Sequence, residues 1–150
     1  MRVSSQVRYA ICAMFDLAYN GRGEPLQVRV VGERQKSPLR YLEQIFRRLR
    51  SAGLVEARRG PGGGYRLARA AAEITLRDVV EAVEGPVAGE RGGAPASRRA
   101  ASSHQPSFLW AELSERIAGA LAEVDLDTLC RDAARAAVRR ADEDARMYFI

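Results

Sequence analysis

Residues 37–65 read SPLRYLEQIFRRLRSAGLVEARRGPGGGY, and this stretch predicts a helix that is followed by a β-hairpin. Ser37 can cap a helix, and Pro38 needs no amide partner in a first turn, so the pair marks a helix start. Gly53 can adopt the left-handed conformation that ends a helix. Residues 54–58 and 65–67 have extended patterns, and the glycine-rich turn between them joins them as a hairpin.

The expected helix over residues 38–52 has an apolar stripe and an opposite polar face. The stripe follows the spacing i, i+3, i+4 and i+7 and consists of Leu42, Ile45, Phe46 and Leu49. The polar face suits DNA, because Arg forks onto guanine, Gln pairs with adenine and Glu accepts from cytosine. A recognition helix reads bases with its N-terminal residues and contacts phosphates with the rest. The expected base contacts are Arg40, Tyr41, Glu43 and Gln44, and the expected phosphate contacts are mainly Arg47, Arg48 and Arg50. An amphipathic helix with a merely solvated polar face would have the same pattern.

The hairpin resembles a DNA-binding wing in its composition. Its tip has almost no side chains, so it can approach a sugar-phosphate backbone or enter the minor groove closely. A nucleotide phosphate loop is excluded, because no Gly-Lys-Ser/Thr follows the glycines and no helix begins there. A flexible hairpin without a partner stays an alternative. The wing residues expected to contact DNA are Arg58, Arg59, Gly60 and Pro61.

The rest of the chain predicts a mainly α-helical fold around this winged helix-turn-helix. Ser4 or Ser5 can cap a first helix. A second helix is expected from about Pro25 to Gln35, although its β-branched residues also fit a strand. Further helices are expected over residues 76–83, from about 107, and from 126 to about 141. The expected units are a DNA-binding domain (1–85), a flexible loop (86–106), dimerisation helices (107–141) and a tail (142–150).

The charge distribution indicates a polyanionic partner. The chain has 150 residues and a formal net charge of +5. Residues 1–70 hold 14 Lys and Arg against five Asp and Glu, whereas residues 71–150 hold 10 against 14. A basic half on an otherwise acidic chain is the footprint expected of a nucleic-acid-binding unit. A solvated basic face without a partner would give the same count.

The composition also argues against several other classes of protein. No stretch reaches the roughly 18–20 apolar residues of a membrane span, and the first residues lack the apolar run of a signal peptide. The two cysteines are far apart in sequence, so we expect a cytoplasmic protein rather than a secreted disulfide scaffold. A catalytic arrangement cannot be assembled around the single histidine, and we expect no enzyme activity.

Four motifs follow one another along the chain: RYA at 8–10, YLEQ at 41–44, GLV at 53–55 and RGPGGGY at 59–65. In this order they resemble the Rrf-two family of winged-helix regulators, which includes IscR-, NsrR- and CymR-like proteins. The resemblance covers nearly the whole chain and supports Tyr41, Glu43, Gln44 and Arg59 to Pro61 as DNA contacts. It implies a homodimer that pairs through the long helix and binds double-stranded DNA at a pseudo-palindromic operator. The residues expected in the pairing seam are Leu113, Ile117 and Leu121.

Many members of this family bind an iron–sulfur cluster through three cysteines in the loop before the long helix. The equivalent residues 87–106 contain no cysteine, and His104 is the only histidine of the chain. Cluster ligation relies on thiolates, and one imidazole cannot complete a metal site. Cys12 on the first helix is expected to be a buried structural thiol, and Cys130 has no cysteine or histidine near it in sequence. The sequence therefore predicts a regulator with no cofactor and no metal.

The C-terminal residues 144–150 resemble those of the cluster-free CymR branch, which controls cysteine metabolism. They end in Tyr148, Phe149 and Ile150, an apolar run that is a liability unless it docks on a surface. Backbone amides in a pocket can capture a C-terminal carboxylate. The partner that the resemblance implies is O-acetylserine sulfhydrylase (cysteine synthase). The alternative is that the tail packs on the protein's own dimer.

Three functional hypotheses follow. The first is a repressor of cysteine and sulfur metabolism genes with the synthase as co-regulator. The second is a repressor of the same family with another trigger, such as a small ligand or a redox signal at Cys12, or with no trigger. The third is a tail-docking partner of the synthase whose DNA binding is vestigial.

Overall fold

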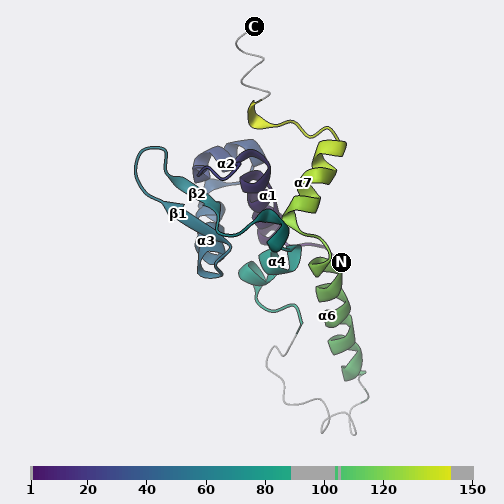
Figure 1. Ribbon diagram of the computed structural model, residues 1–150. Coiled ribbons are helices and arrows are strands. Elements are labelled where there is room, and N and C mark those ends of the chain that lie inside the picture. The colour runs from purple at the N-terminus through teal and green to yellow at the C-terminus, as the bar shows by residue number, and fades with distance from the viewer. Residues whose placement is uncertain (1, 89–103, 105, 143–150) are drawn as a thin grey trace.

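The computed structural model describes residues 2–88, 104 and 106–142 (Figure 1). The fold is mainly α with one two-stranded antiparallel sheet, and the expected winged helix-turn-helix is confirmed. Its elements in chain order are α1 (Ser5–Asn20), α2 (Val28–Gln35), α3 (Leu39–Ser51), β1 (Val55–Arg58), β2 (Gly64–Leu67), the 3-10 turn η1 (Ala71–Glu73), α4 (Leu76–Glu84), α6 (Ser107–Ala122) and α7 (Leu126–Arg135).

Helix α1 lies at the centre of the fold and contacts α2, α3, α4 and α7. It begins as expected, because the Ser4 hydroxyl accepts a hydrogen bond of 3.2 Å from the amide of Val7. Small residues such as Ala10 and Ala13 are fully buried and let the neighbouring helices approach closely. Asp16 is fully buried as well, and its Oδ1 accepts from Arg34 of α2 at 2.9 Å.

Helix α3 has the predicted apolar stripe but not the predicted cap. All four stripe residues belong to the buried core. The helix begins at Leu39, and Ser37 makes no capping bond. Lys36 ends α2 with a left-handed backbone at φ 50°, and the tight turn points the Ser37 hydroxyl back to the carbonyl of Gln35 at 3.3 Å. Gly53, at φ 73°, follows α3 as expected.

The wing is attached to the segment before α2. In the hairpin Val55 pairs with Leu67 and Arg58 pairs with Gly64. Leu26 and Tyr65 exchange two backbone hydrogen bonds of 2.8 Å, so residues 25–27 are extended and α2 begins at Val28 rather than near Pro25. The Tyr65 ring stacks on Phe46 of α3 with centroids 4.6 Å apart. The hairpin is therefore held against both helices of the helix-turn-helix.

The last described helix is shorter than the sequence predicted. It ends at Arg135, not near Ala141, because the chain turns back onto the end of α1. The Tyr19 hydroxyl donates to the carbonyl of Val138 at 2.8 Å, and the Arg140 guanidinium lies 4.1 Å from the Tyr19 ring centroid. The amide of Ala141 also donates to Oδ1 of Asn20, and Asp142 forms an ion pair with Arg22, each at 2.9 Å. We call these contacts of residues 138–142 with Tyr19, Asn20 and Arg22 the C-terminal clasp.

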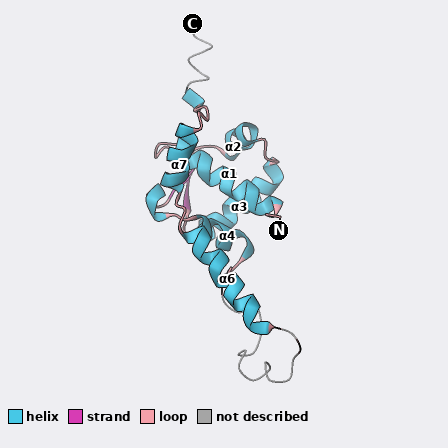
Figure 2. Ribbon diagram, turned by 90° about the vertical axis from the view of Figure 1, so that its right-hand side faces the viewer, coloured by secondary structure: helices cyan, strands magenta, loops and turns pink. Residues whose placement is uncertain are grey.

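Helices α6 and α7 relate differently to the core. Leu126 of α7 is fully buried in the same cluster as the α3 stripe. In contrast, α6 runs out from the core, as both views show (Figures 1 and 2). Phe108 is 69% exposed and Trp110 is 60% exposed on its outer half. Within the described residues, no helix is both long and apolar enough to cross a membrane.

Candidate nucleic-acid interface

The outward face of α3 presents the side chains that the sequence predicted. Arg40, Glu43, Gln44, Arg47 and Arg50 are all exposed. Within the described part of the chain, no ion pair involves any of the three arginines. Cations without an intramolecular partner can neutralise phosphates or fork onto guanine at no cost of a broken ion pair.

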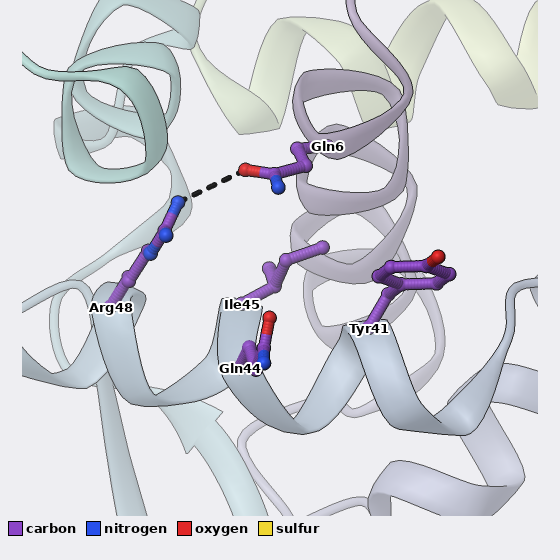
Figure 3. A pocket seen from close by; sticks show the side chains of 5 residues that line it. All are labelled: Gln6, Tyr41, Gln44, Ile45 and Arg48. Atoms are coloured by element: carbon purple, nitrogen blue, oxygen red, sulfur yellow. Dashed lines mark hydrogen bonds between the residues drawn. The ribbon is translucent and has the colours of Figure 1, made fainter.

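Tyr41 and Arg48 flank this face, and both contact α1 (Figure 3). The Tyr41 ring is half exposed and stacks on Tyr9 of α1 with centroids 6.3 Å apart. Arg48 donates from Nη1 to the carbonyl of Val83 at 2.8 Å and to Oε1 of Gln6 at 3.0 Å. Arg48 therefore joins α3 to α4 and α1, and its role as a phosphate contact stays a prediction.

Gln6 and Tyr9 lie beside the outward face of α3, which we call the reading face. The sequence reasoning did not single out these two residues. Gln6, Tyr41, Gln44, Ile45 and Arg48 line a crevice between α1 and α3 (Figure 3). The position of α1 over α3 is a tertiary feature, so helix periodicity alone could not reveal it. The only sequence signal was the RYA motif at 8–10, which includes Tyr9.

The wing lies beside α3 (Figure 1). Arg58, Arg59, Gly60 and Pro61 are exposed. The tip turns tightly, since Gly63 donates to the Gly60 carbonyl at 2.9 Å and a Cβ on Gly63 would lie 2.3 Å from the Arg58 carbonyl oxygen. Glu56 pairs with Arg66 across the strands, whereas Arg58 and Arg59 are in no ion pair within the described residues.

The residues expected in the dimer seam lie along α6. Leu113 is exposed, whereas Ile117 and Leu121 are half-buried. Their assignment to a pairing seam stays a prediction. The tail residues Tyr148, Phe149 and Ile150, and most of the loop 86–106, lie outside the described residues.

The two cysteines are free and half-buried. Cys12 is therefore less buried than the sequence predicted. Burial raises the pKa of the Cys12 thiol above its ordinary value; Asp16 adds to this rise and Arg8 opposes it. Burial and the nearby Asp127 likewise raise the pKa of Cys130. Raised pKa values disfavour the thiolate, which is the reactive and metal-binding form.

Comparisons with known proteins agree with this geometry. A family model described as "Rrf2: Iron-dependent Transcriptional regulator" matches residues 3–132. The HTH-type transcriptional regulator IscR of Photobacterium profundum is 42% identical over 132 residues, which cover 88% of this chain and 77% of that protein.

Solved structures agree as well. IscR of T. potens superimposes with a TM-score of 0.72 at 30% identity, covering 95% of this chain and 96% of the other. CymR, the global cysteine regulator of B. subtilis, has a TM-score of 0.67 at 29% identity, covering 87% of this chain and 97% of the other. These relatives are regulators of transcription and not enzymes, as the sequence predicted.

The expectation of a regulator without a cofactor is wrong for this family. The matching family is described as iron-dependent, and IscR proteins are among the relatives in both sequence and structure. The donor set of this chain nevertheless does not fit a cluster held by three cysteines, because the chain has two cysteines and one histidine. Within the described residues, no group of three or more His, Cys, Asp or Glu is placed to hold a metal ion.

The shared fold, the exposed reading face of α3 and the glycine-tipped wing all agree with the match over residues 3–132. The chain belongs to the Rrf2 (Rrf-two) family of winged-helix transcriptional regulators.

Proposed function

We propose that the chain is a cytoplasmic, homodimeric regulator that binds a pseudo-palindromic operator. In each protomer Arg40, Tyr41, Glu43 and Gln44 of α3 read bases in the major groove. Arg47 and Arg50 contact phosphates, and the wing residues Arg58, Arg59, Gly60 and Pro61 contact the adjacent backbone. The observation that carries the proposal is the exposed face of α3, whose arginines have no ion-pair partner within the described residues, beside the glycine-tipped wing.

The dimer is inferred from the apolar residues of α6. Phe108, Leu109, Trp110 and Leu113 are exposed on one helix that runs out from the core. Contiguous apolar patches of this kind mark interaction sites. A second copy is the occupant that matches a two-fold operator, since a closed dimer presents two reading helices to two half-sites.

The signal that this regulator answers to is best sought outside cysteine metabolism. The sequence relative reported above is an IscR protein at 42% identity, whereas CymR is a structural neighbour whose 29% identity is level with the 30% of the IscR structure. The match to IscR in sequence favours a repressor of the same family with another trigger, such as a small ligand or a redox signal. The second candidate is a repressor of cysteine and sulfur genes that docks its tail on O-acetylserine sulfhydrylase. The likeness to CymR supports it, and deletion of Ile150 tests it by measuring whether binding of the synthase is lost.

A selection from random DNA followed by gel shifts tests the proposed function. The chain is expected to enrich a motif with two related halves and to shift it in preference to a scrambled duplex. Arg47→Gln should weaken the shift, whereas Arg131→Gln removes the same charge from the exposed surface of α7 and should not. A library from which no motif is enriched would overturn the proposed function, and so would equal effects of the two variants.

A further inference from the structure

A polar cavity lies between the N-terminal half of α1 and the turn that joins α2 to α3. Its volume is about 200 Å³, well above the roughly 10–15 Å³ that a single water needs. Ser5, Arg8, Tyr9 and Cys12 line it from α1, and Lys36 and Ser37 line it from the turn. The four α1 residues share one helix face, since they follow the spacing i, i+3, i+4 and i+7.

The cavity is electropositive. Arg8 and Lys36 both border it, and within the described residues neither has a carboxylate partner. The closest acidic side chain on α1 is Asp16, which is fully buried and paired with Arg34 at 2.9 Å. Two cations that face one space repel each other, and an anion between them is favoured.

The hydrogen-bonding groups around the cavity match an oxyanion. Ser5 supplies a hydroxyl donor and Tyr9 supplies a phenol. The Ser37 hydroxyl also lines the cavity, but it donates to the Gln35 carbonyl.

We propose that this cavity is an oxyanion site that takes a phosphate group between Arg8 and Lys36. Two sources carry that chemistry, a free phosphate-bearing small molecule and a backbone phosphate of DNA. The cavity adjoins the reading helix in either case, because Tyr9 stacks on Tyr41 and Ser37 immediately precedes Pro38. Occupancy by a free anion would place a trigger beside the helix that reads bases. Occupancy by DNA would add two cations to the contact surface.

The first arm of the test uses inorganic phosphate and no DNA. Cys12 lines the cavity, so its alkylation by iodoacetamide reports occupancy at this site, and Cys130 on α7 is the internal reference. Phosphate at ten times its Kd should slow alkylation of Cys12 about elevenfold against chloride at matched ionic strength. The rate at Cys130, resolved by peptide mass spectrometry, should not change. Arg8→Gln and Lys36→Gln should abolish the protection, and Arg131→Gln should retain it.

The second arm measures the salt dependence of operator binding and rests on the proposed function. If a DNA phosphate occupies the cavity, Arg8→Gln and Lys36→Gln should each reduce the slope of log K against log salt by about 1. Arg131→Gln should leave the slope unchanged. Protection by free phosphate or the reduced slope supports the site and identifies its source. If neither is observed, the oxyanion proposal is overturned. A chain that binds no operator would refute the proposed function, while the first arm would still decide on the cavity.

Discussion

Gly64→Ala should detach the wing from the segment before α2. A Cβ at this position would lie 2.3 Å from the carbonyl oxygen of Leu26 and 2.9 Å from the amide nitrogen of Gln27. Both neighbours are backbone atoms, so they cannot turn away as a side chain would. The two hydrogen bonds between Leu26 and Tyr65, each 2.8 Å long, must lengthen or break.

The magnitude follows from these contacts. Each lost backbone hydrogen bond costs about 0.5–1.5 kcal/mol. Gly64 also has φ at 151°, where a side chain adds backbone strain of roughly 1–3 kcal/mol. The free energy of unfolding should therefore fall by about 2–6 kcal/mol. Urea denaturation followed by circular dichroism at 25 °C gives this value.

Gly62→Ala is the matched control on the same hairpin. Gly62 has φ at 71°, and no atom lies within 4 Å of the position that a Cβ would take, so alanine there meets backbone strain alone. The expected cost is about 1–2 kcal/mol. If the two variants lose the same stability, the reasoning that the wing is anchored through Leu26 is refuted.

Four further predictions concern the interface and the core. Arg59→Ala should weaken binding to all DNA sequences and reduce the salt slope by about 1, as loss of a phosphate contact does; an unchanged slope in binding titrations would exclude that contact. Glu43→Ala should relax specificity at one base pair by about 1–3 kcal/mol; an unchanged preference in a binding-site selection would remove Glu43 from the base-reading set. Leu126→Ala should cost about 2–5 kcal/mol in one cooperative urea transition, because Leu126 is fully buried in the common core; a separate early transition of α7 would contradict this. The amide of Thr128 holds the pKa of Asp125 below its usual range, so the ionised cap stabilises the fold above the unfolded pKa of about 3.9 and this stabilisation is lost as pH falls through the lower folded value. Asp125→Asn should therefore unfold with the same free energy as the parent chain in acid and with a lower one near neutral pH, as measured by urea denaturation at the two pH values.

The sequence predicted best where a single helix or hairpin determines the outcome. The stripe of α3 depends only on its own periodicity, and Leu42 and Phe46 are buried as expected. The glycine after α3 and the hairpin were predictable for the same reason, since both rest on local backbone conformation.

Most errors arose where the local conformation depends on a residue that is far away in the sequence. Pro25 was expected in a helix, but Leu26 pairs with Tyr65, which lies 39 positions further along the chain. The error at Ser37 was local: it was expected to cap α3, but the left-handed backbone of the preceding Lys36 turns its hydroxyl toward the Gln35 carbonyl. The last helix was expected to continue, but Val138 accepts from Tyr19 at the end of α1. The contacts of Arg48 with Gln6 and Val83 could not be predicted from the sequence either, because they depend on how three helices cross.

Helix α1 connects the C-terminal clasp with the surroundings of the DNA-reading face. At one end of this 16-residue helix, Tyr19 and Asn20 hold residues 138–142. Toward the other end, Gln6 and Tyr9 contact Arg48 and Tyr41 of the reading helix. A helix of this length spans about 24 Å and behaves as a stiff rod. The clasp and the flank of the DNA-reading face are therefore contacted by opposite ends of one continuous helix.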